Sequence, residues 1–181
     1  DGDSGGTAVL LPPSTMVEIP GFGLDQLSKA VDLGGVPLAE LSLRNLLSID
    51  FAHTVTLGPD DLGALSRTLG DVVVENPARL DRVDEAGRIE VLWPEGRVAV
   101  ASADVADFLA TRALGETELE RLVRHQRFWI AYLDARQSIV GVVDDPTLDL
   151  DAFLDEASVR ASELDYRILP VETIGGPEEL Y

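Results

Sequence analysis

Residues 117–137, TELERLVRHQRFWIAYLDARQ, carry the longest helical pattern of the 181-residue chain. Apolar residues recur every three or four positions, which gives a helix one face that can be buried. Thr117 followed by Glu120 is the capping-box pattern that marks the start of a helix. The spacing therefore predicts a long helix over 117–137, against which the other elements pack. Its apolar face comprises Leu119, Leu122, Val123, Trp129, Ile130 and Leu133.

Short apolar runs and helical patterns alternate on both sides of this helix. Strands are expected at 8–11, 16–19, 52–57, 71–77, 88–93, 96–101 and 166–174. Shorter helices are expected at 36–49, 58–70 and 102–114, and from a cap near residue 149 or 151. Such alternation favours an α/β fold with a mixed central sheet, helices on both faces and an apolar interior between sheet and helices. The acidic turn at 144–146 predicts a domain of residues 1–143 and a helix–strand extension of residues 144–181.

The charge balance limits the partners of the chain. Its 33 acidic and 14 basic residues give a net charge of −19, and Lys29 is the one lysine. Such a surface repels nucleic acid, which is excluded as a partner unless basic residues cluster locally. The chain has no cysteine, so disulfides, thiol catalysis and cysteine-based zinc sites are excluded as well.

Five motifs between residues 7 and 137 resemble, in their order and spacing, the extracellular domain of the LytR–CpsA–Psr (LCP) family. The motifs are VEIPGFG at 17–23, VDLGGVPLAELSLRNLLSI at 31–49, FAHTVTLGPDDLGALSRTLGDVVVENP at 51–77, VADFLATR at 105–112 and ERLVRHQRF at 120–128. The resemblance implies an extracytoplasmic domain, anchored to the membrane through a segment outside this chain. It also implies transfer of a glycopolymer from a polyprenyl-pyrophosphate carrier to the cell wall. In that family the lipid lies in an apolar tunnel, and arginines and an aspartate-bound Mg²⁺ hold the pyrophosphate.

Several positions depart from the family's pattern. Pro13 and Ser14 stand where the resemblance calls for arginine and aspartate, Gln26 stands at a lysine position, and Ala110 replaces the first of two arginines. Loss of a single electrostatic donor from an active site lowers the rate by about 10²–10³. We therefore expect a non-catalytic relative, in which no residue is assigned a catalytic role and no metal ligand or cofactor is expected.

The remaining basic residues are candidates for an anion site. They are Arg112, Arg121, Arg124, His125 and Lys29. Three of them share one face of the 117–137 helix, because they are spaced i, i+3 and i+4. The competing interpretation is a solvated helix face that pairs locally with acids such as Glu118 and Glu120. His53, within the expected strand 52–57, is expected to be a half-buried structural residue.

Phe128, Trp129 and Tyr132 either line a lipid pocket or belong to the core, because an aromatic stripe at helical spacing suits both. The main functional hypothesis is a cell-envelope binding module that holds a polyprenyl-type lipid or an envelope protein. One alternative is an active, Mg²⁺-dependent glycopolymer transferase built on the remaining basic residues. The other is a domain that binds only proteins, through residues 144–181.

Overall fold

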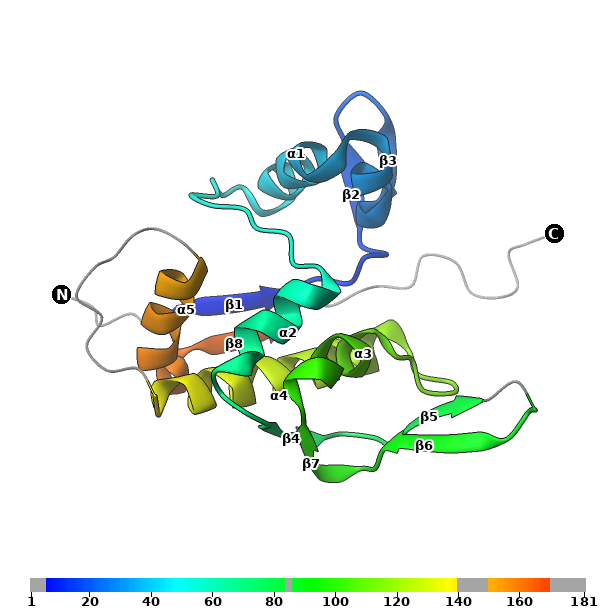
Figure 1. Ribbon diagram of the computed structural model, residues 1–181. Coiled ribbons are helices and arrows are strands. Elements are labelled where there is room, and N and C mark those ends of the chain that lie inside the picture. The colour runs from blue at the N-terminus through cyan, green and yellow to red at the C-terminus, as the bar shows by residue number, and fades with distance from the viewer. Residues whose placement is uncertain (1–5, 84–85, 140–149, 170–181) are drawn as a thin grey trace. The chain divides into compact units, whose positions relative to one another are not determined.

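The computed structural model describes residues 6–83, 86–139 and 150–169 (Figure 1). The chain divides into two compact units: Asp1–Ala8 with Val55–Arg167, and Val9–Thr54 with Ile168–Tyr181. The predicted boundary at 144–146 lies outside the described residues, and helix α5 (Leu150–Val159) belongs to the first unit. No described helix is both long enough and apolar enough to cross a bilayer.

The strands pair in twos. In the first unit β4 (Val72–Asn76) pairs antiparallel with β7 (Gly96–Val100), and β5 (Leu80–Val83) pairs antiparallel with β6 (Ile89–Trp93). β1 (Thr7–Leu10) pairs with β8 (Asp165–Ile168). The helices of this unit are α2 (Pro59–Arg67), α3 (Val105–Ala110), α4 (Glu118–Gln137) and α5, with 3₁₀ turns at Ser102–Asp104 and Ala161–Glu163.

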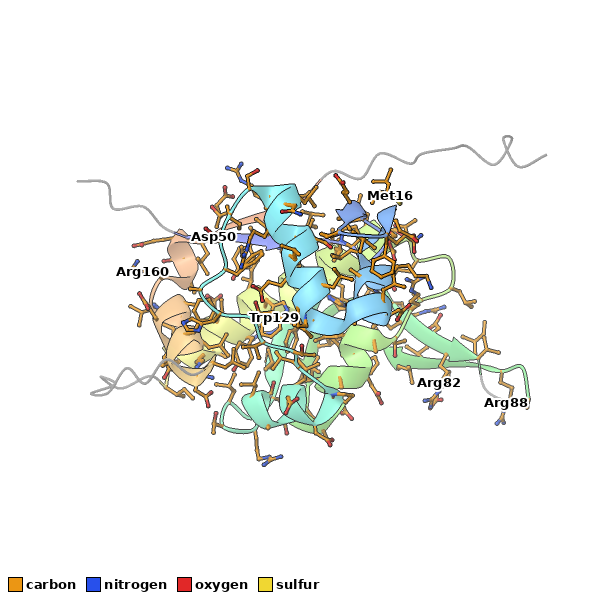
Figure 2. The ribbon with its side chains drawn as sticks, turned by 90° about the horizontal axis from the view of Figure 1, so that it is seen from above. Met16, Asp50, Arg82, Arg88, Trp129 and Arg160 are labelled. Carbon is orange, nitrogen blue, oxygen red and sulfur yellow. The ribbon has the colours of Figure 1, made fainter. Side chains whose placement is uncertain are left out.

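The core of the first unit forms where α4 packs on β4 and α5 packs on α4. Val72, Val74 and Asn76 are buried on one face of β4, as the two-residue period of a strand requires. Trp129 lies among the packed side chains of this unit, whereas Arg82 and Arg160 extend away from it (Figure 2). The buried members of this core are Val72, Val74, Leu80, Val98, Val100, Val105, Phe108, Leu109, Phe128, Tyr132, Leu133 and Leu154.

The described part of the second unit contains one hairpin and one broken helix. β2 (Met16–Ile19) pairs antiparallel with β3 (Gly23–Gln26), and α1 (Leu27–Leu47) packs on β2. The helical path of α1 is interrupted at Gly34 and Gly35, where Gly35 has a φ of +67° that favours glycine. Pro37 is tolerated because it lies in the first turn after the break, where no N–H is needed. The core of this unit consists of Val17, Ile19 and Ala30.

The α/β class and the long capped helix predicted from sequence are confirmed. Thr117 accepts a hydrogen bond from the Glu120 amide at 3.2 Å, and Glu120 accepts one from the Thr117 amide at 2.8 Å. The sheet expected at the centre takes the form of two-stranded ladders in the part of the chain described. The predicted strand at 52–57 is wrong: these residues have no regular structure, and His53 is exposed rather than half-buried. Leu119, expected on the apolar face of α4, is 49% exposed.

Candidate functional site

The connection between α3 and α4 brings four of the five basic candidates into one region of the first unit. Arg112 stands in the connection, and Arg121, Arg124 and His125 lie in the first half of α4. Their surroundings differ. Together they show which side chains are available to a ligand and which are already engaged.

Arg124 is buried, so the interpretation of a solvated face is wrong for this residue. Its side chain is 1% exposed and pairs at 2.9 Å with Glu116, whose side chain is 7% exposed. Its guanidinium also donates to the carbonyls of Phe108 and Thr111. These carbonyls lie at the end of α3, where the last backbone acceptors of a helix lack partners within it. Arg124 therefore caps α3 from the neighbouring helix.

His125 completes this cap. Its Nε2 lies 2.8 Å from the Leu109 carbonyl, and because a carbonyl only accepts, Nε2 carries the proton that is donated. Burial lowers the pKa of His125 below its ordinary value, against a smaller opposing effect of the bond to Leu109. Arg124 and Arg121 lower the pKa of His125 further through their positive charges. His125 is therefore neutral at pH 7 and serves as a donor to the end of α3.

Acid should destabilise the fold through His125. Because the pKa of His125 is lower in the folded state, the unfolded chain binds this proton more readily below about pH 6.5. The free energy of unfolding should therefore fall as the pH drops from 7 to 5, and His125→Gln should reduce that fall. Urea denaturation at a series of pH values measures it. His53→Gln, in an exposed loop, is the matched control. Parallel pH profiles for His125→Gln and the unaltered chain would contradict the prediction.

Arg112 and Arg121 keep guanidinium groups available for a ligand. The Arg112 side chain is 53% exposed, and its Nη2 lies 3.3 Å from Oε1 of Glu118. The Nε of Arg121 is buried and has no hydrogen-bond partner among the residues that the structure describes. Glu118 and Arg121 are one helical turn apart, so the two arginines reach the same stretch of α4. Their use as an anion site stays a prediction.

The fifth basic candidate belongs to the second unit. Lys29 lies on α1, is 54% exposed, and its Nζ is 3.3 Å from Oδ2 of Asp32. A surface pair of this kind is weak and would release the ammonium readily. The participation of Lys29 in an anion site stays a prediction.

The three aromatic candidates pack against one another on α4. The ring centroids of Phe128 and Trp129 are 5.5 Å apart, and those of Trp129 and Tyr132 are 5.4 Å apart. Phe128 and Tyr132 are each 1% exposed, and the Tyr132 hydroxyl donates to the Leu65 carbonyl at 3.2 Å. These contacts show that all three contribute to the core. Their assignment to a lipid pocket stays a prediction.

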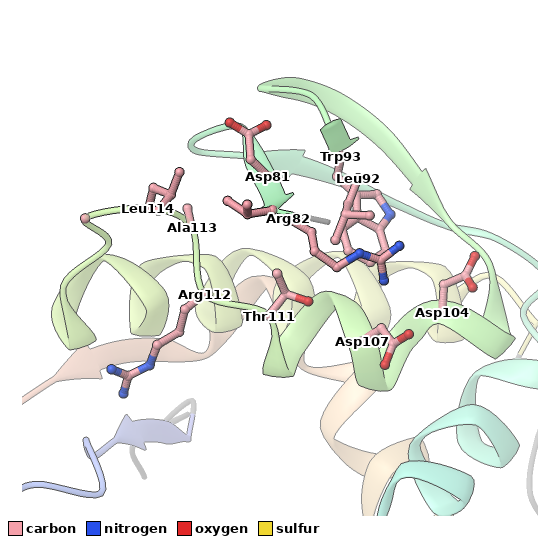
Figure 3. A pocket seen from close by; sticks show the side chains of 12 residues that line it. Asp81, Arg82, Leu92, Trp93, Asp104, Asp107, Thr111, Arg112, Ala113 and Leu114 are labelled. Atoms are coloured by element: carbon pink, nitrogen blue, oxygen red, sulfur yellow. The ribbon is translucent and has the colours of Figure 1, made fainter. Parts of the chain in front are cut away.

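A cleft of about 690 Å³ lies between the β5–β6 hairpin and α3 (Figure 3). Arg82 and Trp93 come from the hairpin, while Asp104 and Asp107 come from the start of α3. Arg112 contributes to its rim, but the Arg112 side chain is directed away from Asp104 and Asp107 (Figure 3). The charged residues of the cleft come from the hairpin and from the region of α3, and Arg112 is the one among them that the sequence predicted as a site residue.

A second buried arginine, Arg136, ties α4 to α5. It donates to the Tyr132 hydroxyl at 2.9 Å, to Oδ1 of Asp151 at 3.0 Å and to Oδ1 of Asp155. Burial acts to lower the pKa of Arg136, but the hydrogen bonds to Asp155 and Tyr132 outweigh it and raise the pKa above its ordinary value. The pattern that would have revealed the buried arginines is their four-residue spacing with Phe128 and Tyr132.

Several solved structures share the fold of this chain. It aligns with B. subtilis TagV at a TM-score of 0.73 and 15% identity, over 93% of this chain and 72% of that one. TagT bound to LIIa-WTA gives 0.62 and 19%, over 90% and 67%. The LytR-CPS2A-psr family protein YwtF (TagT) with bound octaprenyl pyrophosphate lipid gives 0.58 and 19%, over 90% and 65%. No family model and no curated protein matches the sequence. The chain therefore has the fold of LCP domains, as the sequence motifs predicted.

Proposed function

We propose that this chain is a non-catalytic, extracytoplasmic binding domain of the cell envelope, which holds the anionic headgroup of a polyprenyl-type lipid at Arg112 and Arg121. The observation that carries the proposal is the Arg121 guanidinium, whose Nε is buried without an acceptor among the described residues. A buried donor without a partner costs about 1–3 kcal/mol. A phosphate oxygen would satisfy this donor and would accept from Arg112 as well.

The shared fold supports the class of ligand. A solved structure with the same fold contains octaprenyl pyrophosphate, and another is bound to LIIa-WTA. A diphosphate suits paired arginines, because each planar guanidinium can donate two parallel hydrogen bonds. On a chain of net charge −19, a guanidinium donor without an acceptor attracts an anion locally.

The lack of catalysis is proposed from the donors that the chain offers. A Mg²⁺ site needs several oxygen ligands, and carboxylates are its usual protein ligands. Ser14 stands at the position where the resemblance calls for an aspartate, and the described ranges contain no group of three His, Asp or Glu side chains placed to hold a metal. The described residues therefore do not fit the ion. Pro13, Gln26 and Ala110 stand at positions where the resemblance calls for arginine, lysine and arginine, so three cationic side chains are absent from the same motifs.

Arg121→Gln should weaken the binding of octaprenyl pyrophosphate about tenfold, because a charge-assisted hydrogen bond contributes roughly 1.5–3 kcal/mol. Titration calorimetry with the lipid in detergent micelles measures the loss. Arg127→Gln, an exposed arginine on the same helix, should bind like the unaltered chain. Octaprenol, which has the tail without the phosphates, should bind weakly and equally to both variants. Equal binding of the diphosphate by Arg121→Gln and Arg127→Gln would disprove the headgroup site.

The competing hypothesis is an active glycopolymer transferase that uses the retained arginines. Incubation with a polyprenyl-pyrophosphate-linked glycan, a wall acceptor and Mg²⁺ separates the two. Transfer that is lost in Arg121→Gln would replace the binding proposal by the enzymatic one. If the chain binds neither the lipid nor pyrophosphate, the hypothesis of a domain that binds only proteins takes precedence.

A further inference from the structure

The segment that carries Arg112 has few backbone hydrogen bonds of its own. Between α3 and α4, the Thr111 amide donates to the Asp107 carbonyl at 2.9 Å, and the Glu116 amide donates to the Ala113 carbonyl at 3.1 Å. A connection with so few internal restraints takes its shape from the side chains packed against it. The position of Arg112 therefore depends on those side chains.

Arg124 and Glu116 hold the residues on both sides of Arg112. The Nη2 of Arg124 donates to the Thr111 carbonyl at 2.5 Å, and Oε2 of Glu116 accepts from the Ala113 amide at 3.1 Å. Arg124 and Glu116 are joined to each other by three contacts of 2.9–3.2 Å. One buried ion pair thus fixes the backbone immediately before and after Arg112.

The arrangement requires arginine at position 124. Its guanidinium serves the Phe108 and Thr111 carbonyls and Glu116 together, and its Cζ lies 5.5 Å from the centre of the Phe108 ring. A lysine ammonium is a point charge that lacks this planar fork and could not keep all of these contacts. Since the Arg124 side chain is only 1% exposed, its donors are closed to a ligand in solvent.

We propose that Arg124 is a positioning residue of the anion site: with Glu116 it fixes the backbone that presents Arg112, and it does not contact the anion itself. The inference rests on the function proposed above. Arg124 then supports the residues that contact the anion and is not one of them. Arg112 and Arg121 remain as the residues that meet the headgroup.

The binding test uses Arg124→Lys, with Arg127→Lys as the matched exposed control on the same helix. Arg124→Lys should weaken the binding of octaprenyl pyrophosphate about tenfold, because Arg112 is no longer held in place. In an Arg112→Gln background, Arg124→Lys should add little, since the residue through which it acts is gone. Losses that add fully in the double variant would overturn the proposal.

The second test needs no ligand. Amide hydrogen exchange at residues 111–116 should accelerate at least tenfold in Arg124→Lys, while exchange in β4 and β7 stays unchanged. Unchanged exchange at 111–116 would overturn the positioning role. If Arg124→Lys does not fold, Glu116→Asp, which keeps the charge but shortens the side chain, replaces it. Failure of the unaltered chain to bind the lipid would reject the proposed function alone, because the exchange experiment still decides how the backbone is held.

Discussion

Phe108→Ala should lower the free energy of unfolding by about 3–5 kcal/mol, the range for removal of a large buried ring. Phe108 is fully buried on α3 and meets the Trp93 ring edge-on at 5.4 Å and the Phe128 ring at 6.2 Å. The Arg124 guanidinium lies against the same ring. Its removal would leave a cavity between α3, the β5–β6 hairpin and α4. Because the cavity would be bordered by three different elements, we expect the neighbouring side chains to fill it only in part.

Urea denaturation followed by tryptophan fluorescence measures the effect. Phe153→Ala is the matched control, because Phe153 is 65% exposed on α5 and its loss should change stability by less than about 0.5 kcal/mol. If both substitutions cost the same, the packing of α3 described for the first unit is incorrect.

The second large effect is expected for Arg136→Gln, at about 2–4 kcal/mol of unfolding free energy. The Arg136 side chain is 9% exposed, and its removal leaves Asp155, which is 20% exposed, without its cation. It also removes the donor to the Tyr132 hydroxyl. Both losses fall where α5 packs on α4, so that contact should weaken first.

Arg160→Gln provides the comparison for Arg136. Arg160 is 56% exposed and forms a surface ion pair at 3.8 Å with Glu156, which lies four residues earlier in the chain. Such pairs contribute about 0.3–0.5 kcal/mol. Denaturation curves that shift equally for the two variants would show that Arg136 behaves as a surface residue.

Elements with strong local signals were predictable from sequence. The capping box at Thr117, the acidic first turn of α2 and the apolar run of β4 each carry their own pattern, and all three form as expected. β3 and β5 were missed, because GLDQ and LDRV contain too few apolar residues to show alternation. Apolar and polar side chains alternate over residues 52–57, but no strand forms there. Alternation gives a strand one apolar face, but it does not provide a neighbouring strand with which to pair.

The candidate site was predictable only in part. The i, i+3, i+4 spacing placed Arg121, Arg124 and His125 on one helix face, but spacing does not reveal what covers that face. The burial of Arg124 depends on Glu116, which comes from a connection with no regular pattern. Arg124, Phe128, Tyr132 and Arg136 follow one another at intervals of four residues, which places them on one face of α4. This spacing indicated that the two arginines are buried with the aromatic residues, but charged residues are normally expected to be exposed.

The break at Gly34 and Gly35 has a consequence for the energetics of the second unit. It divides α1 into two segments, neither longer than about 12 residues, a length at which an isolated helix is marginal in water. Three buried side chains hold these segments on the hairpin, and hydrophobic burial on that scale is modest. Helix and hairpin must therefore form together or not at all. We therefore expect opening of this unit to require less free energy than unfolding of the whole chain, as is typical of segments that move in response to ligands.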